Sequence, residues 1–149
     1  MAKEVEELIG IACDQAGYDL KLEIIEHLQK RGLQYVDLGT DSKEPTDYPI
    51  YAKRVAEKLL STEIDKGILI CGTGIGISIA ANRYEGIRAA LCHDTFSAKA
   101  TRLHNDANIL AMGARVIGAS LAIDIVDAFL DTPFSNEDRH IKRIKLIEK

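Results

Sequence analysis

Short apolar runs recur along this chain, and segments with helical periodicity separate them. The five runs are Leu8–Cys13, Leu33–Leu38, Gly67–Cys71, Ile87–Cys92 and Asn108–Met112. Apolar strands that alternate with helices predict βαβ units, in which both faces of a parallel sheet are covered. Because crossovers between parallel strands are right-handed, we expect an α/β fold, a Rossmann-like three-layer sandwich around a parallel sheet of these five strands.

The intervening segments are typical of amphipathic helices. Leu20, Ile24 and Leu28 mark one helical face. Later in the chain, an apolar stripe that includes Leu121 and Ile125 lies opposite acidic residues. The residues from about 136 to 149 predict a short, basic C-terminal helix. We find no internal repeat, low-complexity tract or linker, so we expect residues 1–149 to form a single domain.

Composition excludes several classes of function. The formal net charge is -4, whereas binding to a nucleic-acid backbone needs a clustered basic face, so we expect no nucleic-acid partner. No apolar stretch is long enough to span a membrane, and the acidic N-terminal sequence MAKEVEELIGIA is unlike a secretory signal. The three cysteines have no paired spacing, so they predict neither a disulfide framework nor a metal site. This pattern favours a cytoplasmic protein.

The stretch ILICGTGIGISIAANR, residues 68–83, places a cysteine at the mouth of a glycine-rich turn. In open parallel sheets, ligands bind beyond the C-terminal ends of the strands, where this turn lies. It reads G-x-G-x-G, not the G-x-G-x-x-G of dinucleotide-binding folds, and it lacks the Lys-Ser/Thr of a P-loop. A non-catalytic nucleotide-binding module therefore stays a secondary hypothesis. The glycines also let a ligand approach the backbone closely, and the next helix presents N–H groups that can hold a developing oxyanion.

Cys71 has a structural and a functional interpretation. A buried cysteine commonly acts as a small apolar side chain, which is the default interpretation of Cys13 and Cys92. Cys71, however, borders a helix N-terminus, where the helix dipole favours a thiolate. A thiolate beside N–H donors suits removal of a proton from a carbon next to a carbonyl, while the donors hold the enediolate oxygen. A thiol redox sensor is a third interpretation, although no resolving cysteine is evident nearby.

Other polar residues are candidates for proton transfer and for binding an anion. His104 follows a helical segment and can shuttle a proton to a sugar ring oxygen near neutral pH. Asp14, which ends the first strand, is either the polar partner of His104 or a helix N-cap. Arg139 and Arg143 share one helical face, which is either a solvated basic surface or a bidentate site for a phosphate dianion.

These pieces together resemble the ribose-5-phosphate isomerase B family, which is related to galactose-6-phosphate isomerase subunits. The matching segments run almost end to end in collinear order. They are CDQAGYDLK (13–21), DLGTDS (37–42), TDYP (46–49), ILICGTGIGISIAANR (68–83), GIRAAL (86–91), RLHNDANILAMGARVIG (102–118) and DRHIKRI (138–144).

The resemblance implies an aldose–ketose isomerase of sugar phosphates that uses no metal and no organic cofactor. It implies that Cys71 moves the proton between the first two sugar carbons and that Thr73 helps to transfer protons between the oxygens. His104 would open the furanose ring, with Asp14 near the ring oxygen. The implied substrate contacts are the anion-hole residues Gly72, Gly74, Ile75 and Gly76, together with Gln15, Tyr48, Asn105, Arg115, Arg139 and Arg143. Since members of the family are dimers or tetramers with sites between subunits, we expect a homodimer or homotetramer.

Two departures from the family pattern concern the phosphate end of the substrate. Gln15 replaces the usual histidine, and it can donate a hydrogen bond to phosphate but cannot carry charge. The residues before Arg139 are Ser135 to Asp138, where the family commonly has glycines, and we expect the two carboxylates there to face solvent. The expected reaction is interconversion of ribose 5-phosphate and ribulose 5-phosphate. Isomerisation of allose 6-phosphate, or of a free rare sugar, is the alternative within this class.

Overall fold

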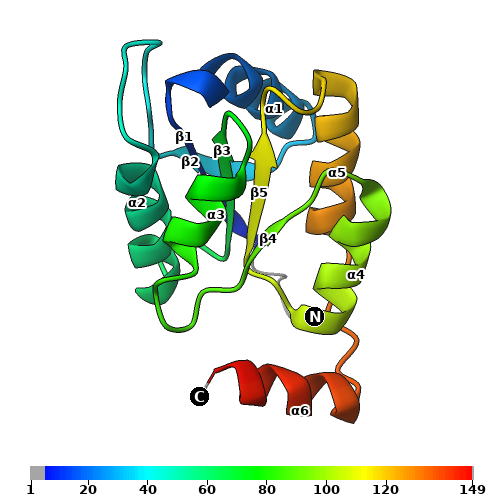
Figure 1. The fold of residues 1–149 in the computed structure, drawn as a ribbon. Helices are drawn as coiled ribbons and strands as arrows, with labels where there is room; N and C mark the ends of the chain where they lie inside the picture. The colour runs from blue at the N-terminus through cyan, green and yellow to red at the C-terminus, as the bar shows by residue number, and fades with distance from the viewer. Residues whose placement is uncertain (1–5, 149) are drawn as a thin grey trace.

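The computed structural model describes residues 6–148, and its centre is a five-stranded sheet in which all strands are parallel. The strands run in the order β2-β1-β3-β5-β4, so β3 lies at the centre and β4 at one edge (Figure 1). Their bounds are β1 Leu8–Cys13, β2 Gln34–Asp37, β3 Lys66–Cys71, β4 Ala89–Leu91 and β5 Ile109–Gly113. The predicted α/β architecture is therefore confirmed. The single domain expected for residues 1–149 stays a prediction, and residues 1–5 and 149 lie outside the described residues.

The predicted strand bounds are correct to within two residues, and the largest difference is at the start of β4. The apolar run begins at Ile87, whereas the strand begins at Ala89. The cause is the Asn108 side chain, whose Oδ1 accepts a hydrogen bond from the N–H of Arg88 at 2.8 Å and whose amide donates to the carbonyl of Gly86 at 2.9 Å. A side chain therefore takes the place that a backbone ladder partner would have had.

Helices cover both faces of the sheet (Figure 1). One face packs against α1 (Tyr18–Lys30), α4 (Thr95–Asn105) and α5 (Ala119–Asp131), and the other against α2 (Tyr48–Leu60) and α3 (Ile75–Ala81). A short 3-10 helix, Gln15–Gly17, joins β1 to α1. None of the helices in residues 6–148 is both long enough and apolar enough to cross a membrane.

The last helix, α6 (Asp138–Ile147), is shorter than the predicted segment 136–149 and lies apart from the three layers (Figure 1). It follows Pro133, after α5 has ended at Asp131. The N–H of Ser135 donates to the carbonyl of Leu103 at 3.2 Å, so the chain that leads into α6 is held at the C-terminal end of α4.

A buried cation connects α1 to the loop that follows β2. Lys21 is fully buried, and its Nζ donates to Oδ1 of Asp37 at 2.7 Å and to the carbonyl of Thr40. The same loop is held from the other side, because the N–H of Thr40 donates to the carbonyl of Cys13 at 2.8 Å. These contacts fix the start of the connection that leads to Tyr48 in α2.

We predict that Lys21→Met lowers the free energy of unfolding by about 2 kcal/mol, because the buried carbonyl of Thr40 loses its side-chain donor and Asp37 loses its cation. Urea denaturation of the two proteins measures the difference. Asp37→Asn is the matched control, since an amide oxygen still accepts from Lys21, and it should lose less than Lys21→Met. Equal stability of wild type and Lys21→Met would contradict this account.

Candidate active site

The C-terminal ends of β1, β3 and β5 form one edge of the sheet. Cys71 pairs with Gly113 in register, and Cys13 pairs with Ile70, so Asp14 and the 71–76 turn leave the sheet side by side. The N–H of Asp14 donates to the carbonyl of Ile70 at 3.2 Å, which holds the two strand ends together.

Two glycines allow the 71–76 turn to lie directly on the end of β5. Gly74 has φ 77°, a left-handed conformation that favours glycine. A Cβ on Gly113 would lie 2.5 Å from the carbonyl carbon of Thr73, which no side chain could tolerate without a shift of backbone. The turn is further fixed because the N–H of Ala114 donates to the carbonyl of Cys71 at 2.8 Å and that of Arg115 to the carbonyl of Gly72 at 3.0 Å.

The thiol of Cys71 lies inside this turn. The residue is 4 % exposed, and its Sγ accepts a hydrogen bond from the N–H of Gly74 at 3.2 Å. Thr73 presents its hydroxyl at the same place, where Oγ1 accepts from the N–H of Ile75 at 3.2 Å. The N–H groups of Gly72, Thr73 and Gly76 have no hydrogen-bond partner among residues 6–148. A sulfur atom, a hydroxyl and a set of unpaired donors therefore meet at one point.

Side chains from the start of α2 and from the loop after β5 lie over the turn. A Cβ on Gly76 would lie 2.6 Å from Cζ of Tyr48, so the phenol ring at the start of α2 rests on the backbone of Gly76. The guanidinium of Arg115 lies against Gly72, with Nη1 3.6 Å from the Cβ that Gly72 lacks. The structure thus brings Tyr48 and Arg115, both expected to bind substrate, to the edge that holds Cys71.

Asp14 caps the 3-10 helix that leads into α1. Its Oδ1 accepts from the N–H of Ala16 at 3.0 Å and from that of Gly17 at 3.3 Å, so the N-cap interpretation is confirmed. Burial raises the pKa of Asp14 above that of an ordinary aspartate, and the two N–H donors and the charge of Arg115 oppose this rise. The neighbouring Gln15 turns its Oε1 to the N–H of Thr46 at 3.1 Å, which leaves its NH₂ group as a donor.

The other two cysteines are unsuited to base chemistry. Burial raises the pKa of both Cys13 and Cys92 to about 11, so both thiols stay protonated at neutral pH. Among residues 6–148 there is no group of three or more His, Cys, Asp or Glu side chains arranged to hold a metal ion.

Sequence reasoning gave no role to His93, which follows β4. Its Nε2 accepts a hydrogen bond from the N–H of Gly113 at 2.9 Å, at the point where Gly113 packs against Thr73. The position of His93 beyond the C-terminal end of a strand was the signal that could have placed it near the site.

Four predicted site residues do not lie near Cys71 within one chain: His104, Asn105, Arg139 and Arg143. α4 starts beyond the C-terminal end of β4 and runs back along the sheet, so His104 and Asn105 lie near the edge where β5 begins. The 11 residues of α4 span roughly 16 Å, which is about the distance between the two edges. Asp14 and His104 therefore do not meet within one chain, and a pairing between them stays a prediction.

Instead, His104 contacts α6. Its ring stacks on that of His140, with the centroids 4.6 Å apart. His140 is buried, its Nδ1 is hydrogen-bonded to Oγ of Ser135 at 2.7 Å, and burial together with the nearby His104 and Arg139 lowers its pKa. Arg139 and Arg143 are exposed, and Arg139 pairs with Glu137 at 2.8 Å. Glu137 and Asp138 are exposed as expected. The ion pair with Glu137, however, involves the Arg139 guanidinium that was expected to bind phosphate.

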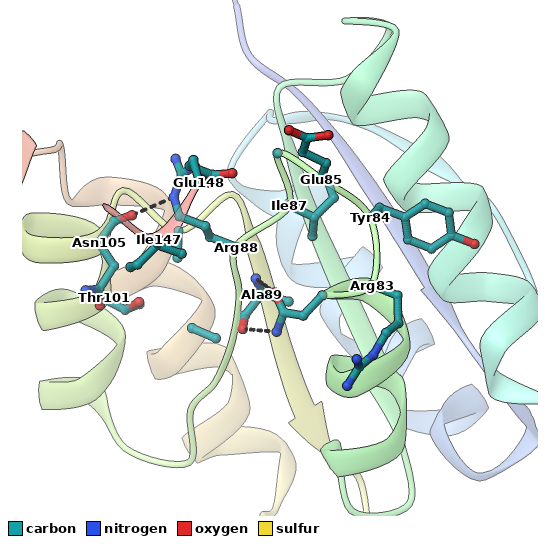
Figure 2. Close-up of a pocket in the computed structure, with 14 residues that line it drawn as sticks. Arg83, Tyr84, Glu85, Ile87, Arg88, Ala89, Thr101, Asn105, Ile147 and Glu148 are labelled. Atoms are coloured by element: carbon teal, nitrogen blue, oxygen red, sulfur yellow. Dashed lines mark hydrogen bonds and ion pairs between the residues drawn. The ribbon is translucent and has the colours of Figure 1, made fainter. Parts of the chain in front are cut away.

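An open cleft of about 710 Å³ adjoins this second group of residues (Figure 2). The loop between α3 and β4, the start of β4, the end of α4 and the end of α6 line it. Figure 2 labels Arg83, Arg88, Asn105 and Glu148 among its residues. Cys71 does not line this cleft. The polar residues of the chain thus form two separate groups at opposite edges of the sheet.

Comparisons with known proteins match both the sequence and the fold. Residues 9–147 match the family model described as Ribose/Galactose Isomerase. Ribose-5-phosphate isomerase B of Escherichia coli is 51% identical over 139 residues, which cover 93% of each chain. The crystal structure of a ribose 5-phosphate isomerase from Thermotoga maritima superposes with a TM-score of 0.94 at 51% identity and covers 97% of this chain and 99% of that one. The ribose-5-phosphate isomerase B of Clostridium thermocellum gives a TM-score of 0.93 at 52% identity, with 95% of each chain covered.

Both the matched length and the identity to these relatives leave one conclusion about descent: this chain belongs to the ribose/galactose isomerase family.

Proposed function

We propose that this protein interconverts ribose 5-phosphate and ribulose 5-phosphate. The observation that carries the proposal is the buried Cys71 thiol, which lies among unpaired N–H groups of the 71–76 turn in a chain half identical to ribose-5-phosphate isomerase B. A base next to an oxyanion site is what removal of a proton alpha to a carbonyl requires.

In this proposal the thiolate of Cys71 removes the proton from C2 of the open-chain aldose. The electron pair moves to the C1 carbonyl oxygen, and the N–H groups of Gly72, Thr73 and Gly76 hold the resulting enediolate. The thiol then returns its proton to C1, while Thr73 relays the hydroxyl proton from O2 to O1. The carbonyl has then moved from C1 to C2. All protons and electrons come from the substrate itself, so the reaction needs no cofactor.

The geometry of the chain supports a site that two subunits share. His104, expected to open the ring, and Arg139 and Arg143, expected to hold the phosphate, lie at the edge opposite Cys71 in the same chain. In a two-fold symmetric dimer, each surface meets the other subunit's corresponding surface, so one subunit's second group can face the other's Cys71. We refer to the group with Cys71 as the acceptor half and to the group with His104, Asn105, Arg139 and Arg143 as the donor half.

Exposed apolar side chains lie on α3, on α4 and on the edge strand β4. Phe96 of α4 is 79 % exposed, and Ile75 and Ile79 of α3 are both 51 % exposed. Leu91 of the edge strand β4 and Leu103 of α4 are also exposed. Large apolar side chains gathered on neighbouring elements are typical of a surface that a partner covers, which supports a homodimer or a larger symmetric assembly. The cytoplasmic location that the cysteine pattern favours stays part of this proposal.

We predict that kcat/KM for ribose 5-phosphate exceeds that for allose 6-phosphate by at least about tenfold. Free ribose should be a much poorer substrate, because it has no phosphate for the arginines to bind. A coupled assay with the three sugars at matched concentrations measures this. A preference for the hexose phosphate would replace the pentose as the substrate, and a preference for the free sugar would remove the phosphate role of Arg139 and Arg143.

We predict that Cys71→Ala lowers kcat by about 10²–10⁴-fold, because the variant keeps the turn but loses the base. In deuterated water, the Cys71 thiol can exchange its proton with solvent before it protonates C1, so wild type should place solvent deuterium on C1 of the product, and the variant should not. Cys92→Ala is the control, since it removes a buried thiol from the other face of the sheet and should retain most activity. Substantial turnover by a folded Cys71→Ala protein would contradict the mechanism.

We predict that Cys71→Ala and His104→Ala subunits complement each other. In a mixed dimer, one site carries both lesions and the other carries none, so about half of the wild-type activity should return. The two chains are coexpressed with different affinity tags, and the dimer selected by both tags is assayed beside each homodimer. If the mixed dimer is as inactive as its parents, then Cys71 and His104 act in the same chain or not together.

A further inference from the structure

We propose that Arg88 is a positioning residue that holds the donor half of the site in place, an inference that rests on the proposed function. Arg88 precedes the edge strand β4. Its guanidinium forms no hydrogen bond with the side chain of any residue expected to contact substrate. It acts through the two helices that carry those residues, α4 and α6.

All three nitrogens of the Arg88 guanidinium are used. Nε donates to the carbonyl of Asn105 at 2.8 Å, and Nη2 donates to the carbonyl of Asp106 at 2.9 Å. Nη1 donates to Oε1 of Glu148, just past the end of α6, at 2.5 Å. Figure 2 shows the Arg88 side chain between Asn105 and Glu148 at the wall of the cleft. Only a planar group with several fixed donors can make these contacts together.

The contacts with α4 fix the end of the helix that bears His104 and Asn105. The last carbonyls of a helix have no partner within the helix. Asp106 ends α4 in a left-handed conformation with φ 45°, and Arg88 supplies donors for the carbonyls of Asn105 and Asp106. The orientation of the His104 side chain therefore depends on the contacts that Arg88 makes with the end of α4.

The contact with Glu148 fixes α6 at its far end. Near its start, α6 is held by the stacking of His140 on His104. Positions 140, 144 and 148 lie on one helical face, and all three are at least partly buried. Contacts at both ends of this face prevent rotation of α6 about its axis, so they set the direction of the exposed Arg139 and Arg143. Without Arg88, Glu148 loses its ion-pair partner, and the C-terminal end of α6 is no longer tied to the wall of the open cleft.

The proposal predicts a division of effects between two variants. Glu148→Ala frees only α6, so KM for ribose 5-phosphate should rise about tenfold while kcat changes little. Arg88→Met frees the ends of α4 and α6 together, so kcat/KM should fall by about 10²-fold, through both kcat and KM. Glu148→Gln retains an acceptor for Arg88 and should stay close to wild type.

Two further variants separate positioning from charge. Arg83→Met removes the same charge from the same cleft, but the Arg83 side chain makes no hydrogen bond or ion pair with residues 6–148, so the kcat/KM of this variant should stay within about threefold of wild type. Arg88→Lys keeps the charge but cannot reach three acceptors, and it should lose activity like Arg88→Met. If Arg83→Met matched Arg88→Met, or if Arg88→Lys were fully active, charge in the cleft would be the cause and the proposal would fail.

The deciding experiment uses mixed dimers, purified with two tags as described above. Arg88→Met damages the donor half, so paired with Cys71→Ala it should recover about half of the wild-type activity, and paired with His104→Ala it should recover none. Recovery with His104→Ala but not with Cys71→Ala would place the lesion in the acceptor half and overturn the proposal. No recovery with either partner would mean a general folding defect and would overturn it as well. The Cys71→Ala and His104→Ala pair run beside them tests the shared site itself, so failure of the proposed function is visible separately.

Discussion

In a parallel sheet, each helix that follows a strand must run back to the edge where the next strand starts. This requirement divides the polar residues of the chain between two edges. Turns after β1, β3 and β5 bring Asp14, Cys71 and Arg115 to one edge, while α4 carries His104 to the other. Within one chain, Cys71 and His104 are therefore separated by the length of a helix, although the proposed reaction needs both at one sugar. The proposed site between two subunits would combine them.

Close contact between two strand ends has a comparable effect within the acceptor half. Because Gly113 has no Cβ, the 71–76 turn lies flat on the end of β5, and Gly74 reverses the chain there. This arrangement turns the N–H of Gly74 toward the sulfur of Cys71 and leaves those of Gly72, Thr73 and Gly76 for a ligand. Donors that are fixed before the substrate binds stabilise developing charge without reorganisation. A side chain at Gly113 would remove the contact on which this depends.

The fold and the acceptor half could be predicted from sequence because they follow from local rules. Apolar runs give the strands, and the ends of parallel strands gather the polar residues that follow them. Asp14 and His104 do not meet within one chain, because His104 ends a helix and that helix returns to the opposite edge. Arg88 could not be assigned a role, since its partners at Asn105 and Asp106 are backbone carbonyls, which every residue has. The start of β4 was missed for a similar reason, because the Asn108 side chain accepts the hydrogen bond from the N–H of Arg88 in place of a backbone carbonyl of a neighbouring strand.

The departures from the family pattern at the phosphate end have a consistent physical effect. Gln15 is held by Thr46, so it offers a neutral donor, and Glu137 already neutralises part of the charge of Arg139. An exposed ion pair of this kind contributes only about 0–1 kcal/mol, whereas a phosphate dianion can accept bidentate hydrogen bonds from a guanidinium. The phosphate can therefore displace Glu137 at small cost. Neither Gln15 nor Glu137 sets the orientation of α6. In the proposed site, the precision of phosphate binding therefore depends on how firmly α6 is held at His140 and at Glu148.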